Sequence, residues 1–226
     1  MKVTYMAHSG FAVETAEHRL IFDYFRGDLD IPDDGKTVIF FVSHFHEDHY
    51  NRGIYSHAER AHTYYVLSRE IKGAPAFAAA TYVRPNCEYE VGGVAVRTLR
   101  STDCGVAYLV FADGEVIYHA GDLHLWVWDG APEESRRRVE QAFRTEIEKL
   151  RGIDIDAAFL PLDPRQDEEG VLGFDYTMRT LRIKRAFPMH FWGLGEYVDA
   201  FCASETASPY RDRIIPLTEE GACVEI

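Results

Sequence analysis

TVIFFVSHFHEDH, residues 37–49, joins a short apolar run to a cluster of polar side chains. The run 37–42 is β-branched and aromatic and ends in polar residues, which predicts a buried strand. Directly after it stand three histidines and an aspartate: His44, His46, Asp48 and His49. Imidazole and carboxylate are ligand types that zinc, iron and manganese share, so this crowding at a strand end predicts a metal site. A cluster this small cannot enclose two ions alone, and we expect further ligands from elsewhere in the chain.

The order of these four residues resembles the HxHxDH signature of the metallo-β-lactamase fold hydrolases. A hydrogen-bonded loop is the alternative explanation, but such a loop would not need all four residues. The resemblance implies that His44 and His46 hold a first divalent ion and that Asp48 and His49 hold a second. It also implies that Asp48 orients the nucleophile.

Two later segments complete the ligand set that the resemblance implies. The segment Ala120-Gly121-Asp122 is similar to the family segment whose aspartate bridges the two metals, a task that suits a carboxylate with two oxygens. His190, in FPMHFWG, matches the last ligand of the family, on the second metal; a buried structural histidine is the alternative. His124, two residues after Asp122, is a candidate proton donor or substitute ligand.

One position departs from the family pattern. Where the wider family has a histidine that completes the first metal's ligands, this chain has Ser101-Thr102-Asp103, and no histidine lies between His62 and His119. Either Asp103 supplies an oxygen ligand and shifts the preference of the site toward manganese or iron, or the first metal is weakly bound or missing. The expected cofactor is therefore one or two divalent ions, with zinc first and manganese or iron as alternatives.

Several other polar residues stand near expected strand ends. His8, in the turn His8-Ser9-Gly10, is interpreted as a turn histidine, and Asp23 as a residue that holds a loop or a metal-binding histidine from behind. His119 is expected on a strand, behind the ligands. Asp163 and Arg165 either contact the substrate or form a salt bridge that fixes their loop.

The alternation of strands and helices, with ligands at strand ends, fits the α/β four-layer αββα sandwich that the resemblance implies, as a single domain over residues 1–226. We expect helices at 51–60, 133–150, 174–184 and 196–204. We expect strands at 2–7, 11–15, 19–23, 37–42, 63–67, 81–90, 94–99, 105–112, 115–119, 156–162 and 186–189, and a final strand segment within 214–226.

Composition excludes several classes of partner. Lys and Arg number 24 against 37 Asp and Glu, giving a net charge of −13, and nucleic-acid binding needs a clustered basic face. The basic run 136–138 alternates with glutamates at helical spacing, which indicates a solvated helix face. Four separated cysteines indicate free thiols in a reducing compartment, and neither a signal peptide nor a long apolar run is evident. We therefore expect a cytoplasmic protein with a small-molecule substrate and no membrane or nucleic-acid partner; a homo-oligomer stays open.

The resemblance covers nearly the whole chain. It is closest to small bacterial metal-dependent hydrolases of the ascorbate-phosphate lactonase type, through the motifs HSG, STD, HAGDLHLW, LPLDPR and PMHFWG. It implies hydrolysis of an ester, lactone or phosphoester by a metal-activated water. Two alternatives stay open. One is a di-iron redox protein that uses the same ligands, and the other is a non-catalytic metal-binding protein with a degenerate first site.

Overall fold

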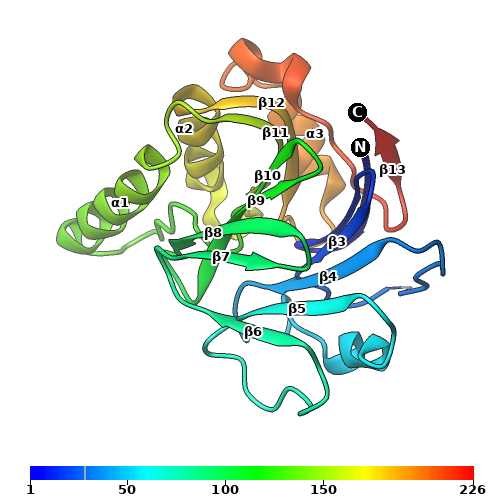
Figure 1. Cartoon of the computed structure of the whole chain (residues 1–226). Helices are drawn as coiled ribbons and strands as arrows, with labels where there is room; N and C mark the ends of the chain where they lie inside the picture. The colour runs from blue at the N-terminus through cyan, green and yellow to red at the C-terminus, as the bar shows by residue number, and fades with distance from the viewer. Residues whose placement is uncertain (28) are drawn as a thin grey trace.

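In the computed structural model, which describes residues 1–27 and 29–226, thirteen strands form two mixed β-sheets (Figure 1). The first sheet has seven strands, in the order β13 (Cys223–Glu225), β1 (Lys2–Ala7), β2 (Gly10–Glu14), β3 (His18–Phe22), β4 (Thr37–Val42), β5 (Thr63–Ser68) and β6 (Ala80–Val83). The second has six, in the order β12 (Arg182–Met189), β11 (Asp154–Pro161), β10 (Glu115–His119), β9 (Val106–Ala112), β8 (Val94–Arg100) and β7 (Glu88–Val91). Strands β3 to β6 are parallel, as are β10 to β12, and the remaining neighbours are antiparallel.

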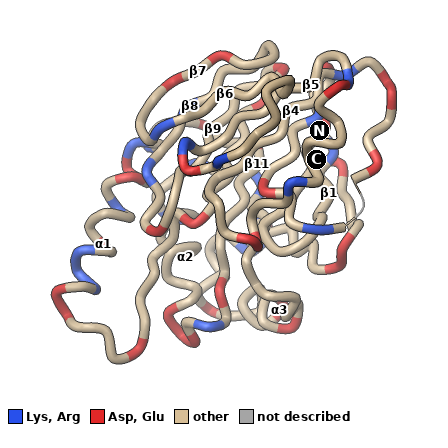
Figure 2. Tube along the Cα trace, turned by 90° about the horizontal axis from the view of Figure 1, so that it is seen from below, with Lys and Arg blue, Asp and Glu red and all other residues tan. Residues whose placement is uncertain are grey.

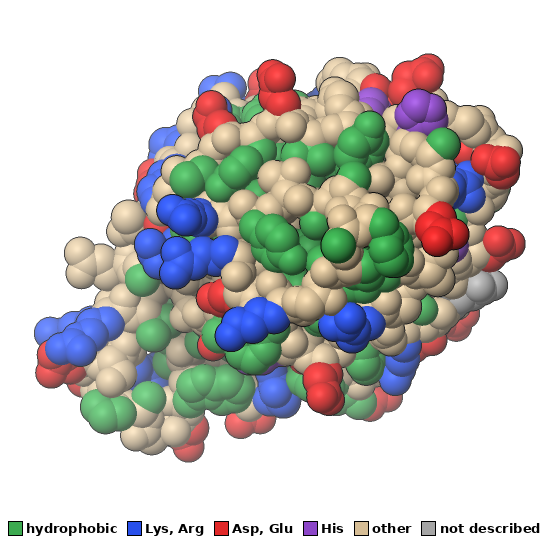
Figure 3. All heavy atoms as spheres, turned by 60° about the horizontal axis from the view of Figure 1, so that its bottom comes forward, with side chains coloured by type: hydrophobic (Ala, Val, Ile, Leu, Met, Phe, Trp, Pro, Cys, Tyr) green, Lys and Arg blue, Asp and Glu red, His purple; other side chains and the backbone are tan. Residues whose placement is uncertain are grey.

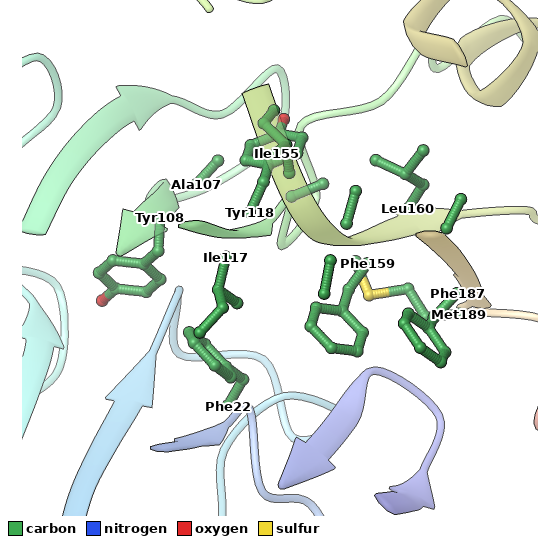
Figure 4. Packing of buried hydrophobic residues seen from close by; sticks show 14 of the residues in the cluster. Phe22, Ala107, Tyr108, Ile117, Tyr118, Ile155, Phe159, Leu160, Phe187 and Met189 are labelled. Carbon is green, nitrogen blue, oxygen red and sulfur yellow. The ribbon is translucent and has the colours of Figure 1, made fainter. Parts of the chain in front are cut away.

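Aromatic and aliphatic side chains fill the space between the two sheets. The ring centroids of Phe22 on β3 and Phe159 on β11 lie 6.2 Å apart, and those of Phe41 on β4 and Tyr108 on β9 lie 5.2 Å apart. Figure 4 shows Phe22 on one side of this core, with Ile117 and Phe159 facing it from the other. Removing one such ring, as in Phe159→Ala, costs about 3–5 kcal/mol of stability. The two sheets therefore form one rigid support for the loops at their edges.

Helices cover the outer faces of the sandwich. The helices are α1 (Glu133–Glu148), α2 (Leu172–Thr180) and α3 (Gly195–Ala203), with the 3-10 helices η1 (Arg52–His57), η2 (Pro164–Val171) and η3 (Ser208–Arg213). Helices α1 and α2 bury Phe143 and Phe174 on the side of the second sheet, whereas η1 places Ile54 and Tyr55 over the outer face of the first sheet. This arrangement confirms the predicted αββα sandwich, although the layer outside the first sheet is only a 3-10 helix and loops.

Hydrogen bonds join the end of β4 to the second sheet. The buried Tyr108 hydroxyl donates to the carbonyl oxygens of Val42, at 2.7 Å, and Val66, at 3.2 Å. The amide of Val106, at the start of β9, donates to the Ser43 carbonyl at 3.1 Å. These bonds place the loop that begins at Ser43 directly against the second sheet.

Two glycines make this close approach feasible. Gly105 has φ +69°, and a Cβ there would lie 1.9 Å from the Ser43 carbonyl oxygen. Gly121 has φ +51°, and its Cβ would lie 2.8 Å from that of Ser43. Only glycine adopts these backbone angles at little cost and leaves room for the neighbouring backbone. The loop after β4 can therefore lie against the segments that precede β9 and follow β10.

Three predicted elements differ from the structure. The single strand expected at 81–90 is two strands in different sheets, β6 and β7, because Pro85 cannot donate a backbone hydrogen bond and Asn86 adopts φ +59°. The helix expected at 174–184 ends at Thr180 because Leu181 is extended, so β12 begins earlier than expected, at Arg182. Within 214–226 only β13 is a strand, and Ile214 makes one isolated bridge.

Basic and acidic residues are interspersed along the chain (Figure 2), and charged side chains of both signs lie on the face that Figure 3 shows. The basic run 136–138 lies on α1, where Arg137 and Arg138 pair with the glutamates one turn earlier, as the spacing predicts. The four cysteines carry free thiols. In the part of the chain that the structure describes, no helix has the length and apolar character needed to cross a bilayer.

Asp113 fastens the turn between β9 and β10 to the turn between β2 and β3. Its carboxylate accepts hydrogen bonds from the Thr15 hydroxyl at 2.6 Å, the Glu17 amide at 2.7 Å and His18 Nδ1 at 3.0 Å. Burial opposes ionisation, but these donors outweigh it and lower the pKa of Asp113 from 3.8 to about 2. The stabilisation is therefore present above pH 4 and is lost as the pH falls from about 4 to about 2.

We predict that Asp113→Asn lowers the free energy of unfolding by about 1–3 kcal/mol at pH 7, because an uncharged amide accepts these bonds more weakly. The difference from the wild type should shrink below pH 4. Urea denaturation at pH 7, 5, 4 and 3 measures it, with Asp199→Asn on exposed α3 as control. A difference that stays constant between pH 7 and 3 would contradict this assignment.

Candidate metal centre

Two groups of potential metal ligands come together where β4, β10 and β12 end. The first contains His44, His46, Asp103 and Asp122, and the second contains His8, Asp48, His49 and His190. In each group every residue offers one ligand atom within 4.8 Å of the others. Strands β10 and β12 run parallel in the second sheet, so Asp122 and His190 follow strands that end at the same edge. The packing of the two sheets brings the loop after β4 to that edge.

Asp122 lies between the two groups. Its Oδ2 is 3.5 Å from His44 Nε2 of the first group, and its Oδ1 is 3.1 Å from His49 Nε2 of the second. The same Oδ1 lies 3.5 Å from His190 Nε2. Each oxygen therefore faces a different group, which is the arrangement expected of a bridging carboxylate.

Buried polar atoms in the centre make no hydrogen bond. His8 Nε2, His49 Nε2 and Asp122 Oδ1 are each shielded from solvent and make no well-aligned hydrogen bond to a described residue. Their nearest polar neighbours are one another and Asp48: His49 Nε2 lies 3.1 Å from Asp122 Oδ1, and His8 Nε2 lies 3.3 Å from Asp48 Oδ2. Leaving such groups unsatisfied costs about 1–3 kcal/mol each, and buried polar atoms are rarely orphaned in folded proteins. A divalent cation would satisfy all three, so these residues fit metal ions.

Buried carboxylates orient the imidazoles from behind. His49 Nδ1 donates to Asp23 Oδ2 at 2.8 Å, and His190 Nδ1 donates to Asp163 Oδ2 at 3.0 Å. Because the proton on a neutral ring then sits on Nδ1, the Nε2 lone pair of each points into the centre. Of the two roles expected of Asp23, holding a loop or holding a histidine of the centre, this contact shows the second, on the candidate ligand His49.

Ser43 extends the same support to His44. Its amide and hydroxyl donate to Asp23 at 2.7 and 2.6 Å. Since the hydroxyl proton is used for Asp23, the oxygen accepts a hydrogen bond from His44 Nδ1, which lies 2.9 Å away. One buried carboxylate, Asp23, therefore orients a histidine of each group.

Burial and charge set the protonation of the ligands. Burial lowers the pKa of His44 and of His8 to about 4, so both rings are neutral and can bind a cation at pH 7. His49 is different: burial disfavours its charged form, but Asp122 and Asp23 outweigh this and raise its pKa well above 6.5. Binding of a metal ion to His49 would therefore release a proton.

The backbone around the second group is strained. His8, His190 and Trp192 adopt φ +53°, +65° and +55°, a region that non-glycine residues rarely occupy. The His190 amide donates to the His8 carbonyl at 3.1 Å, so the two strained positions are tied together. Strain of this kind persists only where the surrounding structure imposes it, and here it directs both rings toward the same point.

Aromatic side chains surround the second group. Trp126 meets His190 edge to face, with centroids 5.4 Å apart, and Trp128 stacks on Trp126 at 6.1 Å. Trp192 lies 4.6 Å from the His8 ring. Trp128 and Trp192 are 42% and 45% exposed, so these two rings lie at the surface beside the second group.

The structure brings together every ligand that the sequence predicts: His44, His46, Asp48, His49, Asp103, Asp122 and His190. His124 belongs to neither group; burial lowers its pKa to about 4, and its ring packs 4.9 Å from that of Trp126. Its role as a proton donor or substitute ligand stays a prediction. His119 lies behind the centre, as expected, where its Nε2 is 2.9 Å from the Ser9 carbonyl oxygen.

Sequence reasoning missed His8. The sequence predicts a turn histidine, and His8 does occupy the turn between β1 and β2, but its Nε2 lies 3.3 Å from Asp48 Oδ2 within the second group. Its position in a tight turn directly after a strand was the available signal. Asp163 and Arg165 form the loop-fixing ion pair that was one of their two expected roles.

The comparisons with known proteins agree with this geometry. The family model described as the beta-lactamase superfamily domain matches residues 2–136. The fold is similar to that of Igni18, a metallo hydrolase from the hyperthermophilic archaeon Ignicoccus hospitalis, with TM-score 0.67 and 17% identity over 100% of this chain and 98% of that one. A comparison with curated proteins gives no match.

Two other solved structures extend the similarity. YhfI from Bacillus subtilis, a metallo-beta-lactamase fold protein, has TM-score 0.67 and 12% identity over 100% of this chain and 98% of that one. CmlA from Streptomyces venezuelae, a diiron beta-hydroxylase, has TM-score 0.64 and 10% identity over 100% of this chain and 54% of that one. At such identities the similarity shows the fold alone, which is that of the metallo-hydrolases.

The contact between Asp23 and His49 generates a prediction. Asp23→Asn should weaken divalent-metal binding about 10–100-fold, because His49 loses the carboxylate that orients it. Competition with a coloured chelator measures the affinity, and circular dichroism checks the fold. Asp199→Asn, on the exposed face of α3, is the matched control. Equal affinity in Asp23→Asn and the wild type would show that Asp23 does not orient the ligands.

Proposed function

This chain belongs to the beta-lactamase superfamily, and we propose that it is a metal-dependent hydrolase that directs an activated water onto an ester, lactone or phosphoester. The observation that carries the proposal is the position of Asp122, whose two oxygens face two separate groups of buried imidazole and carboxylate donors. Two cations held on either side of one carboxylate are suited to hydrolysis.

Bound divalent cations would lower the pKa of a water molecule and stabilise the charge that develops on the attacked oxygen. The chain's own residues fix where this happens. His44, His46, Asp103 and Asp122 would hold one ion, and His8, Asp48, His49 and His190 would hold the other with Asp122. Asp23 and Asp163 keep the imidazoles aimed inward.

Among the candidate metal ligands, the carboxylate of Asp48 is the group best placed to orient the attacking water. Its Oδ2 lies 3.3 Å from His8 Nε2 and 4.0 Å from His190 Nε2. It is also more accessible than Asp122, with 25% of its side chain exposed against 6%. An ionised carboxylate accepts hydrogen bonds and donates none, so Asp48 would align a water through the water's own protons.

The two donor groups support different metals. The second group has three imidazoles and a carboxylate, a set that suits zinc, whereas Asp103 gives the first group two carboxylates and favours manganese or iron there. The four free thiols support a reducing compartment such as the cytoplasm as the setting. A small molecule is the proposed substrate.

Asp103 also favours a second candidate function, a di-iron redox protein. The oxygen-rich first group suits iron, and CmlA, which shares the fold, is a diiron beta-hydroxylase. Protein purified without added ions discriminates the two functions, because an iron centre absorbs visible light and zinc does not. One metal per chain and no turnover would instead favour a non-catalytic metal-binding protein.

The test of hydrolysis uses protein loaded with zinc or manganese and panels of esters, lactones and phosphodiesters. We predict metal-dependent turnover that falls roughly 100-fold or more in Asp48→Ala, because the water loses its orienting acceptor. Metal content is measured on each variant, with Asp199→Asn as control. Activity that persists after chelation, or in a metal-free variant that lacks both Asp48 and His49, would refute the proposal.

A further inference from the structure

Arg165 is held rigidly beside the metal centre. It is the second residue of η2, and its Nε lies 3.0 Å from both carboxylate oxygens of Asp163, while its Nη2 lies 2.5 Å from Oδ2. Asp163 is fully buried and also binds His190. The Arg165 side chain, in contrast, is 47% exposed. Two of the guanidinium nitrogens, Nε and Nη2, are therefore held by Asp163, the carboxylate that orients the candidate ligand His190. Almost half of the Arg165 side chain stays accessible to solvent.

Two tryptophan rings lie beside the guanidinium of Arg165. The guanidinium carbon of Arg165 lies 4.4 Å from the centroid of the Trp192 ring and 5.7 Å from that of Trp128. Trp192 in turn contacts the His8 ring at 4.6 Å, so these rings adjoin the second ligand group. Of the lysines and arginines in the described residues, Arg165 is the one that stacks on a tryptophan.

The donors of Arg165 are only partly used. Its bonds to Asp163 engage Nε and Nη2, and Nη1 makes no hydrogen bond to any described residue. The hydrogen bonds to Asp163 raise the pKa of the guanidinium, and the charges of Asp48 and Asp122 raise it further. Arg165 is thus a fixed cation with spare N–H groups, and the planar guanidinium matches carboxylate and phosphate geometry.

We propose that Arg165, framed by Trp128 and Trp192, is a subsite that binds a carboxylate or phosphate group of the substrate beside its scissile bond. This inference rests on the proposed function and deepens it, because it narrows the substrate to a class. The substrate would be an anion that carries an apolar or flat group next to its carboxylate or phosphate. The tryptophan faces bind that group. The competing explanation is that Arg165 only neutralises Asp163 and so positions His190.

Binding tests the subsite without turnover. Metal-loaded protein is titrated with phenylacetate and with phenyl phosphate, and with 2-phenylethanol as the neutral analogue, while tryptophan fluorescence is followed. We expect Arg165→Gln to weaken binding of the anions about 10–100-fold, the range of a hydrogen bond to a charged group, and to leave the neutral analogue unchanged. The two anions distinguish a carboxylate site from a phosphate site.

Two further variants sharpen the comparison. Arg165→Lys keeps the charge and its attraction to Asp163 but loses the planar fork, and should bind with intermediate affinity. Arg137→Gln, an exposed arginine paired with Glu133 on α1, should bind like the wild type. Anion binding that is equal in Arg165→Gln and the wild type would overturn the subsite.

Kinetics separate the subsite from a positioning role. The probes are mono-4-nitrophenyl glutarate, which carries a carboxylate, and the neutral 4-nitrophenyl butyrate. The subsite predicts that Arg165→Gln loses about tenfold or more in kcat/KM on the anionic ester only, with metal content unchanged. An equal loss on both esters together with lost metal would mean that Arg165 acts through Asp163 and His190, and would overturn the subsite. Anion binding that depends on Arg165, with no hydrolysis of any panel, would support the subsite and refute the proposed function.

Discussion

The candidate site depends on the contacts of one buried carboxylate, that of Asp122, with the imidazoles on either side of it. Burial disfavours its charged form, but His49 and His190 outweigh burial and hold the pKa of Asp122 well below its usual range. Burying a carboxylate among imidazoles away from solvent costs free energy unless a positive charge lies close to it. A proton on His49 supplies part of that positive charge. Bound divalent cations would supply more of it and would give partners to His8 Nε2, His49 Nε2 and Asp122 Oδ1.

The fold brings the donors to this point and prevents them from moving apart. Tyr108 and the glycines at 105 and 121 allow the loop after β4 to lie against the second sheet. Asp23 and Asp163, each on a different side of the centre, then fix the ring orientations through Nδ1. Because these supports are buried backbone and carboxylate contacts, the geometry of the centre belongs to the scaffold. Trp128, Trp192 and Arg165 are more exposed, and it is there that we propose the substrate is recognised.

Much of this arrangement could be predicted from the sequence, since it depends on local patterns. The strand at 37–42 and the candidate ligands that follow it stand in a short motif with a clear composition, and the segment around Asp122 is identified through its resemblance to the family. The turn after the first strand marks His8 as a candidate, but its place in the second group depends on a backbone with positive φ that no local pattern shows. The contact of Asp163 with His190 joins two distant loops and cannot be predicted from either one. Pro85 marks the place where the segment 81–90 breaks, but the sequence does not show that its two halves pair with different sheets, because both are extended.

The most direct measurement of the central claim is anomalous X-ray scattering from crystals of protein purified without added ions. The account predicts two metal peaks about 3.5–4 Å apart, one on each side of Asp122, with His44 and His46 at one and His49 and His190 at the other. An absence of metal at Asp122, in crystals whose solution counterpart contains bound metal, would contradict it.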